Sequence, residues 1–297
     1  MTATDAMADW VLGVIGGSGL YEIEGLADAH WVAIGSPFGA PSDQLLCGRI
    51  GSTRLVFLPR HGRGHRLPPG DINARAIIDA LKRAGCTDVL SLSAAGSLLE
   101  ELAPGTFVVV DQFIDRTFAR ASSFFGPGLT AHVSLADPTC PRLSRMAAEA
   151  ARTAGARVIE GGTYLAMEGP QFSTRAESAL YRSWGCDVIG MTAMPEAKLA
   201  REAELPYASV AMITDYDCWR DTEVEVAQIL EVLAANAAMA RDLVRHLAEA
   251  APASRAASPI DTCLDGAIIT APAARDPAMV ARLSAIAGRA LGSPAAP

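Results

Sequence analysis

Short apolar runs alternate along the chain with segments of helical periodicity. The apolar runs are bounded by Gly, Pro or Asp, which is typical of buried strands. They lie at residues 11–15, 54–59, 88–93, 106–110 and 207–213, with weaker runs at 163–167 and 187–191. Apolar positions with helical spacing lie between several of them, at residues 73–84, 142–154, 174–183 and 194–204. This alternation predicts an α/β fold, with a mostly parallel or mixed sheet covered by helices on both faces.

The C-terminal part of the chain has a different pattern. A long Ala-rich helix is predicted at about 223–250, and the stretch APASRAASP ends it. Asp276 and Pro277 provide an N-cap and a first-turn proline for a last helix at about 278–291. We therefore expect one large domain over residues 1–250 and a C-terminal appendage with one helix over residues 251–297.

Composition and charge restrict the partners. The net charge of −8 argues against a nucleic-acid or polyanion binder, so a small molecule is the expected partner. No apolar stretch reaches the roughly 18–20 residues of a membrane span, and residues 1–10 lack the features of a signal peptide, so a cytoplasmic protein is expected. The six cysteines form no C-x-x-C motif, which argues against a zinc site or a disulfide framework.

The first predicted strand runs into a glycine-rich turn, VLGVIGGSGL at residues 11–20. A dinucleotide fingerprint would need a third glycine where Glu22 stands, and the lysine of a P-loop is absent. What remains is a tight turn with backbone N–H groups and the Ser18 hydroxyl, which suits a small oxyanion. A turn that only reverses the chain is the alternative.

Two further segments could bind an anion. LPRHGRGHRLPPGDIN, residues 58–73, concentrates positive charge directly after a strand, where ligands bind in open α/β sheets. LSAAGSL, residues 92–98, repeats the pattern of a strand followed by small and hydroxyl side chains. A phosphate or a carboxylate is the expected guest, while a solvated basic loop and an ordinary turn remain alternatives.

An aromatic residue precedes a helix start in AMEGPQFSTRAE, residues 166–177. Ser173 or Thr174 is expected to cap the helix, with Glu177 in the fourth position. Phe172, held in a loop, could stack on a heterocycle or pack in the core.

Two carboxylates follow an apolar strand in MITDYDCW, residues 212–219. If Asp215 and Asp217 face one pocket, burial and mutual repulsion raise the pKa of at least one of them. A carboxylic acid of that kind can protonate a leaving group. An acidic turn or a helix cap is the alternative.

Taken in order, several motifs resemble those of the 5′-methylthioadenosine phosphorylases, a family of the trimeric purine nucleoside phosphorylase superfamily. The motifs are GGSGL, PRHGRGH, SAAGS, DQFIDRT, EGPQFSTRAE, DVIGMT and TDYDCW, and the match runs from residue 11 to about 247. The resemblance implies a nucleoside phosphorylase domain with a central mixed, partly barrel-like sheet flanked by helices. It also implies a homotrimeric pentosyltransferase in which phosphate is a co-substrate and neither metal nor organic cofactor takes part.

The resemblance also assigns roles to residues of this chain. It implies a phosphate site made by Ser18, Arg60, His61, Ser93, the backbone of Ala94, and Thr192. Phe172 would stack on the purine, Met191 would lie under the ribose, and Asp215 and Asp217 would bind the purine edge, with Asp215 donating a proton to N7. The 5′ pocket would be formed by Val226, Ile229 and Leu230 together with His132, which would come from a neighbouring subunit.

Two features favour 5′-methylthioadenosine as the substrate, cleaved to adenine and 5-methylthioribose 1-phosphate in purine and methionine salvage. An ionised Asp217 can accept a hydrogen bond from a 6-amino group, and Ser173 stands where 6-oxopurine enzymes carry a glutamate. An apolar wall on the predicted helix suits a methylthio group, although the same spacing is typical of core residues. A 6-oxopurine nucleoside phosphorylase and a non-catalytic nucleoside-binding protein remain the alternatives.

Overall fold

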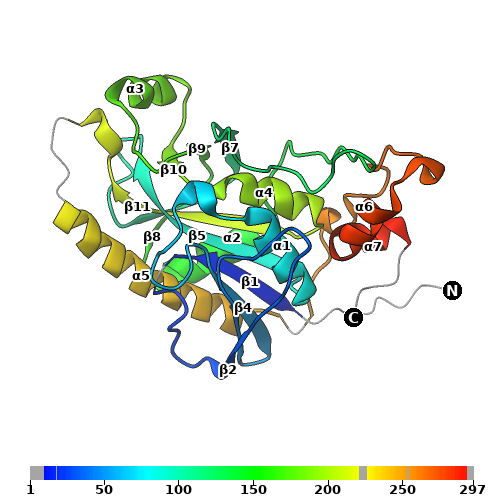
Figure 1. Cartoon of the computed structure of the whole chain (residues 1–297). Helices are drawn as coiled ribbons and strands as arrows, with labels where there is room; N and C mark the ends of the chain where they lie inside the picture. Colours follow the sequence, from blue (N-terminus) through cyan, green and yellow to red (C-terminus); the bar gives the residue numbers. More distant parts are fainter. Residues whose placement is uncertain (1–9, 18, 221–225, 253, 293–297) are drawn as a thin grey trace.

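The computed structural model describes residues 10–17, 19–220, 226–252 and 254–292 (Figure 1). The strands are β1 (Val11–Gly16), β2 (Ala27–Val32), β3 (Leu45–Ile50), β4 (Thr53–Pro59), β5 (Asp88–Ser97), β6 (Thr106–Val110), β7 (Gln112–Asp115), β8 (Arg157–Glu160), β9 (Thr163–Ala166), β10 (Val188–Gly190) and β11 (Tyr207–Asp215). The helices are α1 (Ala74–Arg83), α2 (Pro141–Thr153), α3 (Arg175–Ser183), α4 (Ala193–Glu202), α5 (Val226–Glu249), α6 (Pro277–Arg282) and α7 (Ser284–Leu291). No helix among these residues is both long and apolar enough to span a bilayer.

All seven predicted strands and the four predicted central helices are confirmed. The strands that the apolar pattern missed are β2, β3, β7 and β8. Three of them, β2, β7 and β8, lie at ends of the strand order and carry mostly exposed or half-buried residues. Edge strands of this kind tolerate polar side chains, so they give no apolar run in the sequence.

The eleven strands form one mixed sheet that branches at β5. β5 pairs in parallel with β1 and β11, and its C-terminal end pairs antiparallel with β10. Only Asp111 separates β6 from β7, and β8 and β9 are separated by Gly161 and Gly162, both at positive φ. β6 and β7 therefore follow each other almost without interruption, as do β8 and β9. β6 pairs in parallel with β8, and β7 pairs in parallel with β9. As a result, the path β5, β11, β6–β7, β9, β10 returns to β5. This closure agrees with the expected partly barrel-like sheet.

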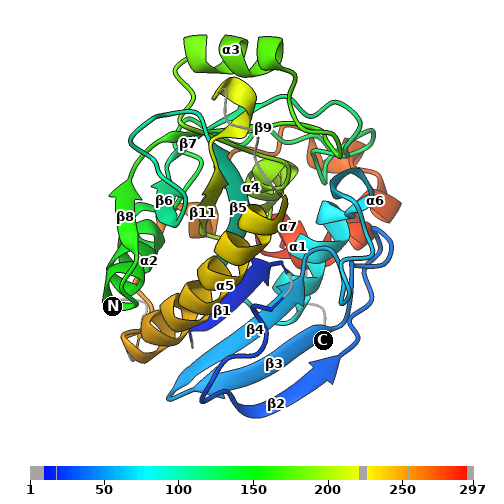
Figure 2. The same ribbon diagram turned by 90° about the vertical axis from the view of Figure 1, so that its left-hand side faces the viewer.

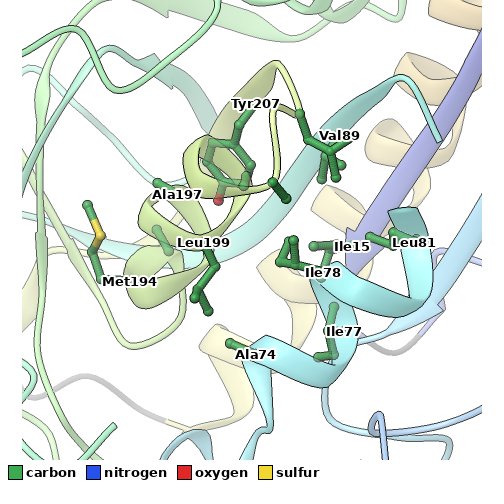
Figure 3. Packing of buried hydrophobic residues seen from close by; sticks show 14 of the residues in the cluster. Ile15, Ala74, Ile77, Ile78, Leu81, Val89, Met194, Ala197, Leu199 and Tyr207 are labelled. Carbon is green, nitrogen blue, oxygen red and sulfur yellow. The ribbon is translucent and has the colours of Figure 1, made fainter. Parts of the chain in front are cut away.

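Helices cover both faces of the sheet, as the alternation predicted. Val11 and Ile15 of β1 belong to a core with α1, α4 and α7, whereas Leu12 and Val14 face a second core with α2 and α5. Figure 3 shows the first core, where Ile77 and other α1 side chains meet those of α4 and β1. Figure 2 shows α5 running along the opposite face beside β4.

The helix predicted at 278–291 is two helices, because the backbone at Leu283 leaves the helical region between α6 and α7. Figure 1 shows α7 beside α1, with α6 next to α7, and Leu283 and Ile286 are buried in the first core. Arg289 forms an ion pair with Glu204 at the C-terminal end of α4. The long helix predicted at 223–250 is α5, although residues 223–225 lie outside the described residues.

Candidate active site

A cavity of about 410 Å³ opens at the carboxyl ends of β1, β4, β5, β10 and β11. Ligands bind at this edge in open α/β sheets because the loops that follow the strands converge there. Nine residues predicted from the sequence line the cavity: Arg60, His61, Ser93, Ala94, Phe172, Met191, Thr192, Asp215 and Asp217. The structure therefore brings together motifs that are more than 150 residues apart in the chain.

One side of the cavity contains buried hydroxyl groups. Oγ of Ser93 and Oγ1 of Thr192 are buried and have no hydrogen-bond partner among the described residues, and the same holds for Oη of Tyr164 behind them. A Cβ at Gly190 would collide with that Oη, so only glycine fits between the tyrosine and the cavity. Buried hydroxyls are normally hydrogen-bonded, so this group is suited to an oxyanion with several acceptor oxygens.

Arg60 lies behind the same side of the cavity and is 1 % exposed. Its Nε donates to Oε1 of Glu196 at 2.6 Å, and its Nη2 donates to Oε2 of the same carboxylate at 3.1 Å. Further donation to the Leu92 carbonyl (2.8 Å) and to Oγ of Ser91 (2.7 Å) fixes the guanidinium. The guanidinium is therefore held rigidly behind the cavity by a buried ion pair.

The predicted basic loop divides into two parts. His61 and His65 line the cavity, with their rings stacked at 4.1 Å and nearly parallel. Arg63 instead pairs with Asp43 at 2.8 Å, and Arg66 donates to the Ser42 carbonyl. The solvated-loop alternative is thus wrong for Arg60 and His61, whereas the two later arginines stabilise the loop itself.

The opposite side of the cavity contains an aromatic ring and the two carboxylates. Phe172 is 76 % exposed, so the alternative of a core phenylalanine is wrong. Asp215 accepts hydrogen bonds from Oγ1 of Thr214 (2.7 Å) and from the backbone N–H of Asp217 (2.9 Å). Burial raises the pKa of Asp217, and the negative charge of Asp215 acts in the same direction. Of the two carboxyls, Asp217 is the one whose pKa is raised.

Gly96 of β5 lies close to Asp215 and Ile189, and this close approach requires a residue without a side chain. A Cβ there would lie 3.3 Å from Oδ2 of Asp215 and 3.2 Å from a methyl carbon of Ile189.

Of the two residues expected to cap α3, Thr174 is the N-cap. Its side chain accepts from the N–H of Glu177 in a complete capping box. Ser173 is buried beside it.

Three residues that support the site were not predicted from the sequence: Tyr164, Glu196 and Arg120. Arg120 donates to the carbonyl oxygens of Met191 (2.5 Å) and Glu168 (2.5 Å), so it ties together two segments that line the cavity. Glu196 gave no distinct signal, because it is one of several charged residues in the helix predicted at 194–204. Tyr164 lies in an apolar run and gave none.

Some predicted residues do not reach the described cavity. Ser18 lies outside the described residues, as do the side chains of Val226, Ile229 and Leu230 in the first turns of α5. Further along the same helix, Leu233 and Ala237 line the cavity. His132 is exposed, and its backbone N–H donates to the Ala267 carbonyl. Among the residues that the structure describes, no group of His, Cys, Asp and Glu could hold a metal ion.

Comparison with known proteins gives the class to which this fold and cavity belong. Residues 11–249 match the family model of the phosphorylase superfamily, and the chain belongs to that superfamily. Relatives within it are S-methyl-5′-thioadenosine phosphorylases. The protein of that name from Cereibacter sphaeroides is 60 % identical over 95 % of this chain and 98 % of its own length. The one from Rhodospirillum rubrum is 56 % identical over 97 % of this chain and its full length.

Solved structures that resemble this chain are also methylthioadenosine phosphorylases. A methylthioadenosine phosphorylase from an Antarctic soil metagenomic library superposes with a TM-score of 0.90 at 41 % identity, covering 94 % of this chain and 99 % of its own. The methylthioadenosine phosphorylase from Schistosoma mansoni in complex with adenine has a TM-score of 0.76 at 37 % identity, covering 81 % of this chain and 91 % of its own.

Proposed function

We propose that this enzyme catalyses the phosphorolysis of 5′-methylthioadenosine to adenine and 5-methylthioribose 1-phosphate. The observation that carries the proposal is the division of one cavity into two sides. Unpartnered hydroxyls and a guanidinium lie on one side, and an exposed aromatic ring with two carboxylates lies on the other. That division suits a phosphate and a purine held on either side of a ribose.

The proposed mechanism follows the movement of charge. As the glycosidic bond lengthens, the sugar becomes cationic and the purine gains negative charge. Phosphate, held by Arg60, His61, Ser93 and Thr192, attacks the anomeric carbon and stabilises the cationic sugar. Asp215 donates a proton to N7, so the base leaves as neutral adenine. Positioning and electrostatic stabilisation then provide most of the rate enhancement.

The preference for a 6-aminopurine rests on the purine side. Asp217 offers a carboxylate that can accept from the amino group, and Ser173 offers no charge that would bind a 6-oxopurine. Met191, Met167 and Leu233 add apolar surface to the cavity, which suits a methylthio group better than a free hydroxyl.

The test is purine release by the purified protein. We expect release of adenine from 5′-methylthioadenosine that requires inorganic phosphate and persists after treatment with a chelator. Inosine serves as the matched substrate, since faster release of hypoxanthine would instead indicate a 6-oxopurine nucleoside phosphorylase. Tight binding of the nucleoside without release of either base would indicate a binding protein, and loss of activity with the chelator would contradict the metal-independent mechanism.

We also propose that the enzyme is a homotrimer in which His132 reaches the 5′ pocket of a neighbouring subunit. Light scattering should give three times the chain mass of 31.0 kDa. His132→Ala should raise the KM for 5′-methylthioadenosine while leaving the mass unchanged. A monomer with full activity would contradict this assembly.

A further inference from the structure

We propose that His61 distinguishes phosphate from other tetrahedral oxyanions by accepting the proton of hydrogen phosphate at Nε2. The inference rests on the proposed use of phosphate and adds a chemical role to one residue of that site. It concerns which anion is bound, and it would leave the nucleoside reaction otherwise as described.

The tautomer of His61 follows from one hydrogen bond. Nδ1 lies 2.9 Å from the carbonyl oxygen of Leu67, and a carbonyl oxygen can only accept. Nδ1 must therefore carry the proton. In the neutral ring, the other nitrogen then has a lone pair and no hydrogen. Nε2 makes no hydrogen bond to any other described residue, and the ring lines the cavity, so this lone pair is available to a ligand.

The surroundings of the ring keep it neutral. Burial lowers the pKa of His61 to about 4, and the adjacent positive charge of Arg60 also lowers it, as does His65. The bond to Leu67 and the carboxylate of Glu196 act in the opposite direction, but the carboxylate is already paired with Arg60. His65 stacks on one face of the ring and so restricts its rotation.

The other ligating groups cannot make this distinction. The hydroxyls of Ser93 and Thr192 can donate or accept, because the hydrogen can rotate to suit the ligand, and the guanidinium of Arg60 only donates. A fully ionised oxyanion therefore satisfies all three. At Nε2 of His61, however, a fully ionised oxyanion would place an oxygen lone pair against the nitrogen lone pair, and the two repel each other. Hydrogen phosphate keeps one P–OH proton at neutral pH and can donate it there, whereas sulfate has none.

The test is anion binding by calorimetry at slightly alkaline pH, without nucleoside. Hydrogen phosphate, sulfate and fluorophosphate are then all dianions of similar shape, and only the first carries a proton. The wild-type protein should bind phosphate roughly 10²-fold or more tightly than either of the other two. Similar affinities for all three would overturn the inference without any variant, because they would show that Nε2 carries a proton.

Two variants complete the experiment. His61→Asn keeps a donor for Leu67 and removes Nε2, so phosphate should bind about 10- to 100-fold more weakly, with little change for sulfate. Ser93→Ala is the control, since loss of a donor should weaken both anions by the same factor. Equal losses for both anions in His61→Asn would contradict the role. Adenine release by the wild-type protein is measured separately, so failure of the proposed function would be recognised on its own.

Discussion

Replacement of Asp215 by Asn should lower turnover of 5′-methylthioadenosine by roughly 10²–10⁴-fold, the usual contribution of a general acid. The carboxylate lies at the end of β11, where it is fixed by Thr214 and by the backbone of Asp217. Asparagine can keep a hydrogen bond to N7 but has no proton to transfer. Turnover at saturating nucleoside and phosphate measures the loss directly.

The matched variant is Asp217→Asn. Its expected effect is on the preference for 5′-methylthioadenosine over methylthioinosine, with a smaller loss of turnover. Burial raises the pKa of Asp217, and the neighbouring Asp215 acts in the same direction, so the two carboxyls are tested as a coupled pair. A larger loss of turnover in Asp217→Asn than in Asp215→Asn would assign the acid to Asp217, and near wild-type rates in both would show an acidic turn without catalytic function.

The central part of the fold could be predicted because its strands are buried on both faces. β1, β5 and β11 are buried along most of their length and consist mainly of apolar and small residues, and the alternation with helices then fixes the layers. Edge strands such as β8 are exposed and gave no such signal. The closure of the sheet depends on the pairing of β7 with β9 and of β10 with β5, strands that are distant in the sequence, and no local pattern encodes such pairing.

The site was predictable where its residues follow strands directly. Phe172, Asp215 and the residues after β4 lie at strand or loop ends, and these positions converge in any sheet of this kind. The supporting residues differ, because they act through contacts that are distant in the sequence. Glu196 meets Arg60 across 136 residues, and Arg120 reaches Met191 across 71. Pairing at such separation depends on the completed fold.

Glu196 should therefore be essential for stability although it lies behind the cavity. Its carboxylate neutralises Arg60 and accepts from Oγ of Ser91, with side-chain exposures of 2 % for Arg60 and 1 % for Glu196. Glu196→Ala leaves the guanidinium buried without a counter-charge, and we expect a loss of about 3–5 kcal/mol in the free energy of unfolding. Chemical denaturation monitored by circular dichroism measures it.

Two further variants test whether the uncompensated charge causes the loss. Glu160→Ala removes the partner of Arg152 from an ion pair that is about half exposed, and solvent screening limits its expected cost to about 1 kcal/mol or less. The double variant Arg60→Met with Glu196→Leu removes both buried charges and should recover part of the stability lost in Glu196→Ala. It should nevertheless bind phosphate weakly, because the cavity has lost its fixed positive charge. If the double variant is no more stable than Glu196→Ala, the uncompensated charge of Arg60 is not the cause of the loss.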